Sequence, residues 1–131
     1  MYVLDTNMLI YFFKGEGRVA ENLLAQPPAT IAVPTIVLYE LHAGILKSHS
    51  PRKLLTQLED FQQTVEVLDF GTTEARSAAE IRARLESAGE PIGPYDILIA
   101  ATARAHGGTL VSRNQREFGR VAGLQTVDWF E

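Results

Sequence analysis

Short apolar runs alternate with longer segments of helical periodicity along the whole chain. Four runs of aliphatic and β-branched residues predict buried strands: Tyr2–Leu4, Thr30–Val33, Val65–Leu68 and Thr109–Ser112. A fifth short run, Gln125–Val127, has the composition of one further strand. Strands that alternate with helices form a mostly parallel sheet with helices on both faces. The pattern therefore predicts an α/β fold, a three-layer α/β/α sandwich with four or five strands.

Glycine, proline and capping residues mark where the helices between these strands begin and end. The predicted helices are Met8–Phe13, Val19–Leu24, a helix from Pro34 or Thr35 to about Lys47, one that starts at Ser50-Pro51, one that Thr72 or Thr73 caps and that ends near Ala88, and Pro94–Ala105. The last of these is very rich in alanine and aliphatic residues, so we expect it to be central. Asn114–Phe118 has the composition of a turn or a short helix.

Length and composition restrict the class of protein. The chain has 131 residues, so we expect one domain over residues 1–131 with a sizeable core. Hydrophobic residues make up 46% of it, which excludes a disordered polypeptide. There is no cysteine, which excludes disulfides and thiolate zinc sites. No apolar run approaches the roughly 20 residues of a membrane helix and no signal peptide is seen, so we expect a cytoplasmic protein without membrane contacts.

The net charge of −4 argues against nucleic-acid binding by bulk electrostatics. Every basic residue after Lys53 is nevertheless an arginine. Guanidinium groups bind phosphates in bidentate fashion, which lysine cannot do. The bias therefore has two explanations: phosphate recognition, or composition alone.

Polar side chains follow the predicted strands or open the helices beside them. The set consists of Asp5, Glu40, Asp96, Asn114 and Glu117. Each has a simple structural explanation, as a helix cap, a first-turn acid or a turn residue. Their common placement is more informative, because the carboxyl ends of parallel strands meet at one edge, where open α/β sheets bind ligands.

Carboxylates that converge in this way need a counter-charge. Two unit charges about 4 Å apart repel by roughly 4 kcal/mol at an effective dielectric constant of about 20. Such acids take up protons or hold a cation, and a hard divalent ion such as Mg²⁺ suits an all-oxygen site that substrate phosphate completes. Hydrolysis of a phosphodiester is the chemistry that this arrangement serves best.

Four segments together resemble the PIN-domain family, and more narrowly the VapC toxins of bacterial toxin–antitoxin pairs. These segments are Leu4–Asn7, Val37–Leu41, Ile92–Ala101 and Val111–Phe118. The resemblance covers essentially the whole chain in the right order. It implies a PIN-like fold and an endoribonuclease that depends on Mg²⁺ or Mn²⁺. It further implies inhibition by a VapB-like antitoxin, operator DNA binding by the toxin–antitoxin complex, and a homodimer.

The resemblance also assigns roles to residues. Asp5, Glu40 and Asp96 match the three core acids, as metal ligands or, for Glu40, as the group that orients the attacking water. The fourth acid departs from the family pattern, because many PIN domains have aspartate where this chain has Asn114. Either Glu117 supplies that carboxylate or Asn114 offers a neutral oxygen. Supporting roles fall to Thr6 and Ser112, which would hold carboxylates, and to Arg113 and Arg116, which would contact RNA phosphates.

Two further expectations follow from this sequence. A degenerate PIN domain that binds RNA or protein without catalysis is the alternative function, and Asn114 is the best argument for it. Apolar residues in the first helix and in Ile36–Leu46 exceed what one core-facing stripe needs. Because exposed apolar patches mark partner surfaces, we expect these helices to form a homodimer contact, an antitoxin groove or both.

Overall fold

A computed structural model describes all 131 residues of the chain. Its strands are β1 (Tyr2–Leu4), β2 (Ile31–Pro34), β3 (Glu66–Leu68), β4 (Thr109–Val111) and β5 (Gln125–Val127). Its helices are α1 (Thr6–Lys14), α2 (Val19–Leu24), the 3-10 turn η1 (Pro28–Thr30), α3 (Thr35–Leu46), α4 (Pro51–Gln62), α5 (Thr72–Ser87), α6 (Pro94–Ala105) and α7 (Gln115–Phe118). The predicted alternation is therefore confirmed, including the fifth strand.

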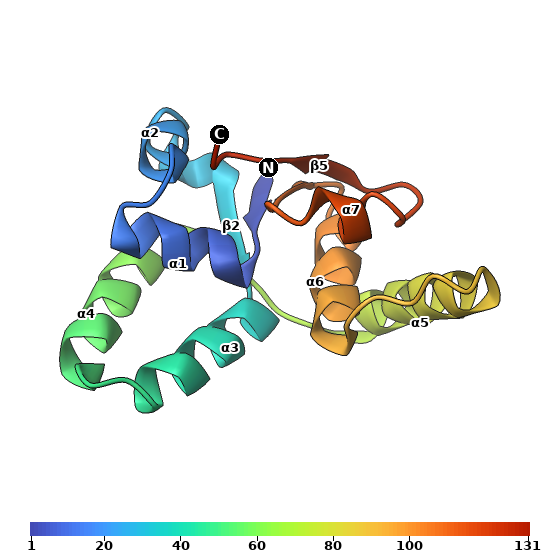
Figure 1. Cartoon of the computed structure of the whole chain (residues 1–131), viewed down its shortest axis with the longest axis horizontal. Helices are drawn as coiled ribbons and strands as arrows, with labels where there is room; N and C mark the ends of the chain where they lie inside the picture. Colours follow the sequence, from blue (N-terminus) through green and yellow to red (C-terminus); the bar gives the residue numbers. More distant parts are fainter.

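The five strands form one fully parallel sheet in the order β3-β2-β1-β4-β5. The first strand is thus the middle one, with β2 on one side and β4 on the other. Helices α1 to α4 lie on one side of this sheet, and α5 and α6 lie on the other (Figure 1). The arrangement is the predicted three-layer sandwich, and it places every strand's carboxyl end at the same edge.

The core confirms that β1 and α6 are central. Val3 and Leu4 of β1 are fully buried, and so are Ala100, Ala101 and Ala103 of α6. Small side chains on α6 allow the helix to approach both the sheet and α5, against which it packs most extensively. None of the helices has the length and apolar character needed to span a bilayer.

Two helix starts differ from the prediction. Helix α1 begins at Thr6 rather than at Met8, because the Asp5 side chain caps it by accepting a hydrogen bond of 2.9 Å from the Met8 N–H. The predicted cap of α5 by Thr72 or Thr73 is wrong. Gly71 is the N-cap residue, and its N–H donates to the Glu74 carboxylate at 2.8 Å. A side chain reaching back to the cap replaces the hydroxyl that the sequence suggested.

The C-terminal segment packs onto the loop after α1. The Arg18 N–H donates to the Phe130 carbonyl at 2.8 Å, and the Phe130 ring meets Tyr11 edge-on with centroids 5.0 Å apart. Gly17 lies beneath this ring with φ of 60°, and a Cβ built on it would come within 2.7 Å of Phe130. Gly15 also has a left-handed φ, of 69°, but has no atom within 4 Å of such a Cβ.

These two glycines give a matched test of the packing of the C-terminal segment. We expect Gly15→Ala to cost about 1 kcal/mol of unfolding free energy, because alanine disfavours a left-handed backbone. Gly17→Ala should cost roughly 1–3 kcal/mol more, because the methyl group also displaces Phe130. Urea unfolding of both variants measures the difference. Equal losses would show that Phe130 moves aside freely.

Candidate active site

The structure brings the predicted acids to the carboxyl edge of the sheet. Asp5 directly follows β1, and Glu40 lies in α3, which starts where β2 ends. Asp96 lies in the first turn of α6, and Glu117 lies in α7, which follows β4. The charge of Glu40 raises the pKa of Asp5, and the charges of Glu117, Asp5 and Glu40 raise the pKa of Asp96. The four carboxylates therefore form one electrostatic cluster.

Asp5 is the most buried of the acids, with only 7% of its surface exposed. Burial raises the pKa of its carboxyl from 3.8 to about 6. Hydrogen bonds from the buried Ser112 hydroxyl and the Met8 N–H act in the opposite direction, and the charges of Glu40 and Asp128 raise the pKa further. The same side chain therefore caps α1 and carries a charge that the fold disfavours.

Asp96 is only partly buried, yet its pKa is also raised, from 3.8 to about 6. Removal from water is the main cause, followed by repulsion from Glu117, Asp5 and Glu40. A hydrogen bond with Glu117 acts in the same direction. Two carboxyls with raised pKa values at the edge of a parallel sheet are typical of a functional site.

Hydrogen bonds hold the remaining side chains of the cluster. The Thr6 hydroxyl donates to the Glu40 carboxylate at 2.6 Å. The Asn114 amide donates to the Glu117 carboxylate at 3.0 Å, while its oxygen accepts from the Glu117 N–H at 3.4 Å and caps α7. The Asn114 N–H in turn donates to the Ser112 hydroxyl at 2.9 Å. Asn114 thus orients Glu117, whose charge has the largest effect of the neighbouring carboxylates on the pKa of Asp96.

Asp128 also belongs to the cluster, although the sequence alone did not single it out. It directly follows β5, its charge raises the pKa of Asp5, and its carboxylate accepts a hydrogen bond of 2.8 Å from the Phe130 N–H. The rule that found Asp5, an acid directly after a strand, applies equally to Asp128. The signal was weak because no residue of β5 is fully buried, so its composition marks a strand less clearly than that of the other strands.

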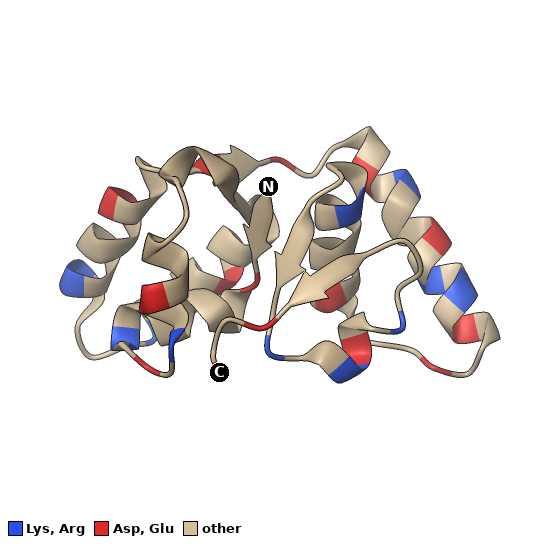
Figure 2. Ribbon diagram, turned by 90° about the horizontal axis from the view of Figure 1, so that it is seen from above, with Lys and Arg blue, Asp and Glu red and all other residues tan.

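The two predicted phosphate-binding arginines lie beside α7. Arg113 stacks on the Phe130 ring, with its guanidinium carbon 3.6 Å from the ring centroid, and reaches Glu131 at 3.8 Å. Arg116 is exposed on α7. Figure 2 shows both acidic and basic residues near the middle of the molecule as well as toward its two ends. Contact with RNA phosphates remains a prediction for both arginines.

The donor set at the sheet edge fits a hard divalent cation. The atoms that could ligate a cation are all oxygens. A bound cation would also reduce the repulsion between the charged carboxylates. No three acidic side chains converge closely enough to ligate one ion together. One or two direct carboxylate ligands, with water completing the shell, is therefore the arrangement that fits, and it is the one that Mg²⁺ prefers.

Comparison with known proteins identifies the family. The family model described as "PIN domain" matches residues 2–124, which include Asp5, Glu40, Asp96, Asn114 and Glu117. The chain belongs to the PIN-domain family. It is 36% identical to the tRNA(fMet)-specific endonuclease VapC of Shigella flexneri, over 98% of this chain and 97% of that protein. It is 38% identical to Ribonuclease VapC2 of Haemophilus influenzae, again over 98% and 97%.

The fold agrees with the same group of PIN domains. The VapBC2 complex of Rickettsia felis, crystallised with a DNA fragment from its promoter, contains a chain that superposes with a TM-score of 0.91 at 35% identity. The superposition covers 98% of each chain. The predicted resemblance to the VapC group is therefore confirmed, and the sheet edge of this PIN domain carries the acids that the resemblance singled out.

The raised pKa of Asp5 predicts a pH-dependent stability for the metal-free protein. Its carboxyl has a pKa of 3.8 when exposed and about 6 when folded, so the protonated form stabilises the fold, and this stability is lost as pH rises through 6. Asp5→Asn keeps the cap but removes the charge. The free energy of unfolding of the variant, relative to that of wild type, should increase by about 2 kcal/mol when the pH rises from roughly 4.5 to 7.5.

Urea unfolding in EDTA at both pH values measures this gain. Asp60→Asn, which changes an exposed acid on α4, is the matched control and should show no such change. A stability difference between Asp5→Asn and wild type that does not vary with pH would contradict the prediction.

Proposed function

We propose that this protein is a metal-dependent endoribonuclease toxin of the VapC type, neutralised by a cognate antitoxin. The observation that carries the proposal is the pair Asp5 and Asp96, whose carboxyls share raised pKa values at the carboxyl edge of a PIN-domain sheet. Relatives that align over nearly the whole chain are named ribonucleases or endonucleases. The retained acids weigh against the alternative of a non-catalytic binding module.

In this proposal Asp5 and Asp96 would ligate a Mg²⁺ ion directly, with Mn²⁺ as a substitute, and Glu40 and either Glu117 or Asn114 would lie around it without all ligating it at once. The bound ion supplies Lewis-acid stabilisation of the phosphodiester and a water nucleophile at neutral pH. Thr6 fixes Glu40 by its hydrogen bond, so that the Glu40 carboxylate orients the attacking water. Ser112 fixes Asp5 in the same way.

The substrate class follows from the relatives. The Shigella flexneri protein is named a tRNA(fMet)-specific endonuclease. We propose a structured RNA, with tRNA as the first candidate, as the substrate of this chain. Arg113 and Arg116, beside Asn114, are the residues proposed to contact its phosphates.

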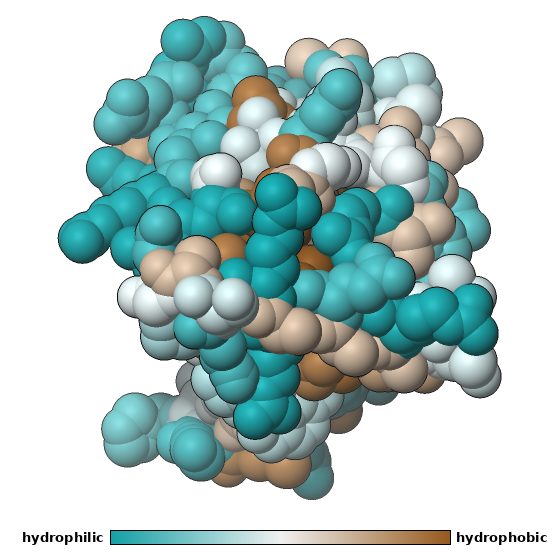
Figure 3. Space-filling model, turned by 90° about the vertical axis from the view of Figure 1, so that its right-hand side faces the viewer, coloured by the Kyte–Doolittle hydropathy of each residue, from teal (hydrophilic) through white to brown (hydrophobic).

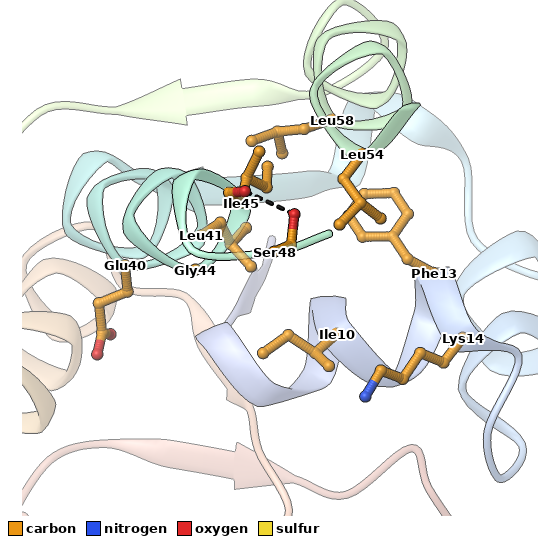
Figure 4. A pocket seen from close by; sticks show the side chains of 10 residues that line it. All are labelled: Ile10, Phe13, Lys14, Glu40, Leu41, Gly44, Ile45, Ser48, Leu54 and Leu58. Atoms are coloured by element: carbon orange, nitrogen blue, oxygen red, sulfur yellow. Dashed lines mark hydrogen bonds between the residues drawn. The ribbon is translucent and has the colours of Figure 1, made fainter. Parts of the chain in front are cut away.

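An apolar groove between α1, α3 and α4 is the proposed binding site of the antitoxin. It has a volume of about 320 Å³, and its wall includes Ile10, Phe13, Leu41, Ile45 and Leu54. Figure 4 shows these side chains around the groove, with Glu40 at one end and Lys14 at the other. By contrast, the side that carries α5 and α7 is mostly hydrophilic (Figure 3).

The predicted surplus of apolar residues on α1 is explained only in part by this groove. Phe13 lines it, whereas Tyr11 packs against Phe130 and Phe12 packs against Phe61. An amphipathic antitoxin helix laid into the groove would reach Glu40 and the active site. The Rickettsia felis VapBC2 complex is bound to promoter DNA. For this chain we propose likewise a homodimer whose antitoxin complex, and not the toxin alone, binds operator DNA.

The nuclease proposal predicts that cleavage depends on both metal and carboxylates. Purified protein should cut bulk cellular RNA with Mg²⁺ and not with EDTA. Asp5→Asn and Asp96→Asn should each lose about 100-fold or more in rate, since an essential catalytic group is removed. Glu117→Gln should cleave RNA at a rate between those of these variants and wild type, because the Glu117 carboxylate acts on the site through its effect on Asp96. Gel electrophoresis of the RNA products measures the rates.

The control for folding is the thermal melt, which both Asn variants should keep at or above that of wild type because repulsion within the cluster falls. Metal-independent cleavage, or cleavage that survives both substitutions, would overturn the proposal. A folded protein that binds RNA but never cuts it would favour the non-catalytic module.

The groove proposal is tested at Gly44 of α3. A Cβ at this wall position would have no atom within 4 Å, so Gly44→Arg places a large side chain in the groove without disturbing the fold. We expect affinity for the cognate antitoxin to fall about 10-fold or more. His42→Arg, at an exposed position of the same helix, is the matched control. Calorimetric titration with the antitoxin measures both, and equal affinities would exclude the groove.

A further inference from the structure

Two tyrosines on different helices form an exposed aromatic pair. Tyr39 of α3 is 54% exposed and Tyr95 of α6 is 44% exposed, which is unusual for large aromatic side chains in this protein. Their ring centroids lie 5.6 Å apart with the planes inclined at 56°, and their hydroxyl oxygens lie 3.3 Å apart. The hydrogen bond between the hydroxyls fixes both rings while leaving much of their surface open to solvent.

The pair lies at the mouth of the candidate active site. Tyr39 directly precedes Glu40, and Tyr95 directly precedes Asp96. Helices α3 and α6 contact each other at the carboxyl edge of the sheet (Figure 1), and Tyr95 lies within electrostatic reach of Glu40. The rings therefore bridge the two helices that supply two of the site's acids.

The segments that carry the two tyrosines offer no lysine or arginine to bind a phosphate. The chain has no such residue between Arg18 and Lys47, nor between Arg84 and Arg104. These two segments therefore present no cationic side chain to a phosphate, and the exposed rings are the surface that they offer to a nucleotide base. Every base has an aromatic face, and stacking on a tyrosine ring binds it without regard to sequence.

We propose that Tyr39 and Tyr95 form a stacking platform that binds an unpaired nucleobase of the RNA next to the phosphodiester that is cut. This rests on the proposed nuclease function and adds the side chains that position its substrate. A second protein molecule is a poorer occupant, because a stable interface buries about 800 Å² on each partner. Of the other exposed large hydrophobic residues, Met1 lies at the opposite sheet edge and Leu24 lies on α2. Leu46 lies on the face of α3 that carries Tyr39, but two turns away at the end of the helix.

The test compares Tyr39→Ala and Tyr95→Ala with Tyr39→Phe and Tyr95→Phe. Loss of a stacking ring weakens single-strand binding about 5- to 150-fold, so each Ala variant should raise KM by that factor and leave kcat within about twofold. The Phe variants keep the ring and should stay within about twofold of wild type in KM. If the pair served only to join α3 to α6 by its hydroxyls, the Phe variants would be as impaired as the Ala variants.

A binding assay separates this proposal from the nuclease proposal. Fluorescence anisotropy measures the affinity of the uncleaving Asp5→Asn protein for a short single-stranded RNA, and for copies with one base removed at each position in turn. One abasic position should reproduce the loss caused by Tyr95→Ala, and the two losses should not add. If the Ala variants bind RNA more weakly but the wild-type protein cleaves no RNA, the platform proposal would stand and the nuclease proposal would be wrong.

Three results would overturn the platform. The first is an unchanged RNA affinity in both Ala variants. The second is additive losses at every abasic position. The third is an unchanged RNA affinity together with a shift from dimer to monomer in light scattering, which would assign the tyrosines to a protein interface instead.

Discussion

Repulsion between carboxylates at one edge of the sheet is the constraint on which the rest of this structure depends. Asp5 is buried and Asp96 is partly buried, and the two carboxylates lie close enough to repel each other, with Glu40 and Glu117 beside them. The fold tolerates this because the surrounding donors are fixed: Ser112 and the start of α1 on Asp5, Thr6 on Glu40, and Asn114 on Glu117. The rigid core of β1 and α6 keeps the charges together.

Hydrophobic periodicity was sufficient to predict most of the fold. The strands have buried, β-branched runs and the long helices have clear stops, so their order was evident, and alternation alone implied a parallel sheet. Hydrophobic periodicity does not indicate which atom caps a helix. Thr72 or Thr73 was the expected cap of α5 because a threonine hydroxyl is a good cap, but the Glu74 carboxylate reaches back to the Gly71 N–H and fills that role.

The candidate site was predictable to the extent that it obeys the sheet-edge rule. Asp5, Glu40, Asp96 and Glu117 were all selected by that rule, and family resemblance added the roles assigned to them. The relation between Asn114 and Glu117 was left open, and the structure shows a division of labour: Asn114 caps α7 and holds Glu117. Which distant segments come together depends on the packed fold, so the sequence did not indicate that Asp128 acts on Asp5 or that Tyr39 meets Tyr95.

The central place of β1 has a consequence for synthesis on the ribosome. Its neighbour β4, with Ser112 and α7 after it, is made roughly a hundred residues later than β1 itself. Until then the strand has an open edge on one side, and Asp5 lacks the Ser112 hydroxyl and the charge of Asp128. Pairing over such a sequence separation is slow. A growing chain therefore carries no complete site, so its activity can appear only after Ser112, α7 and Asp128 have been made.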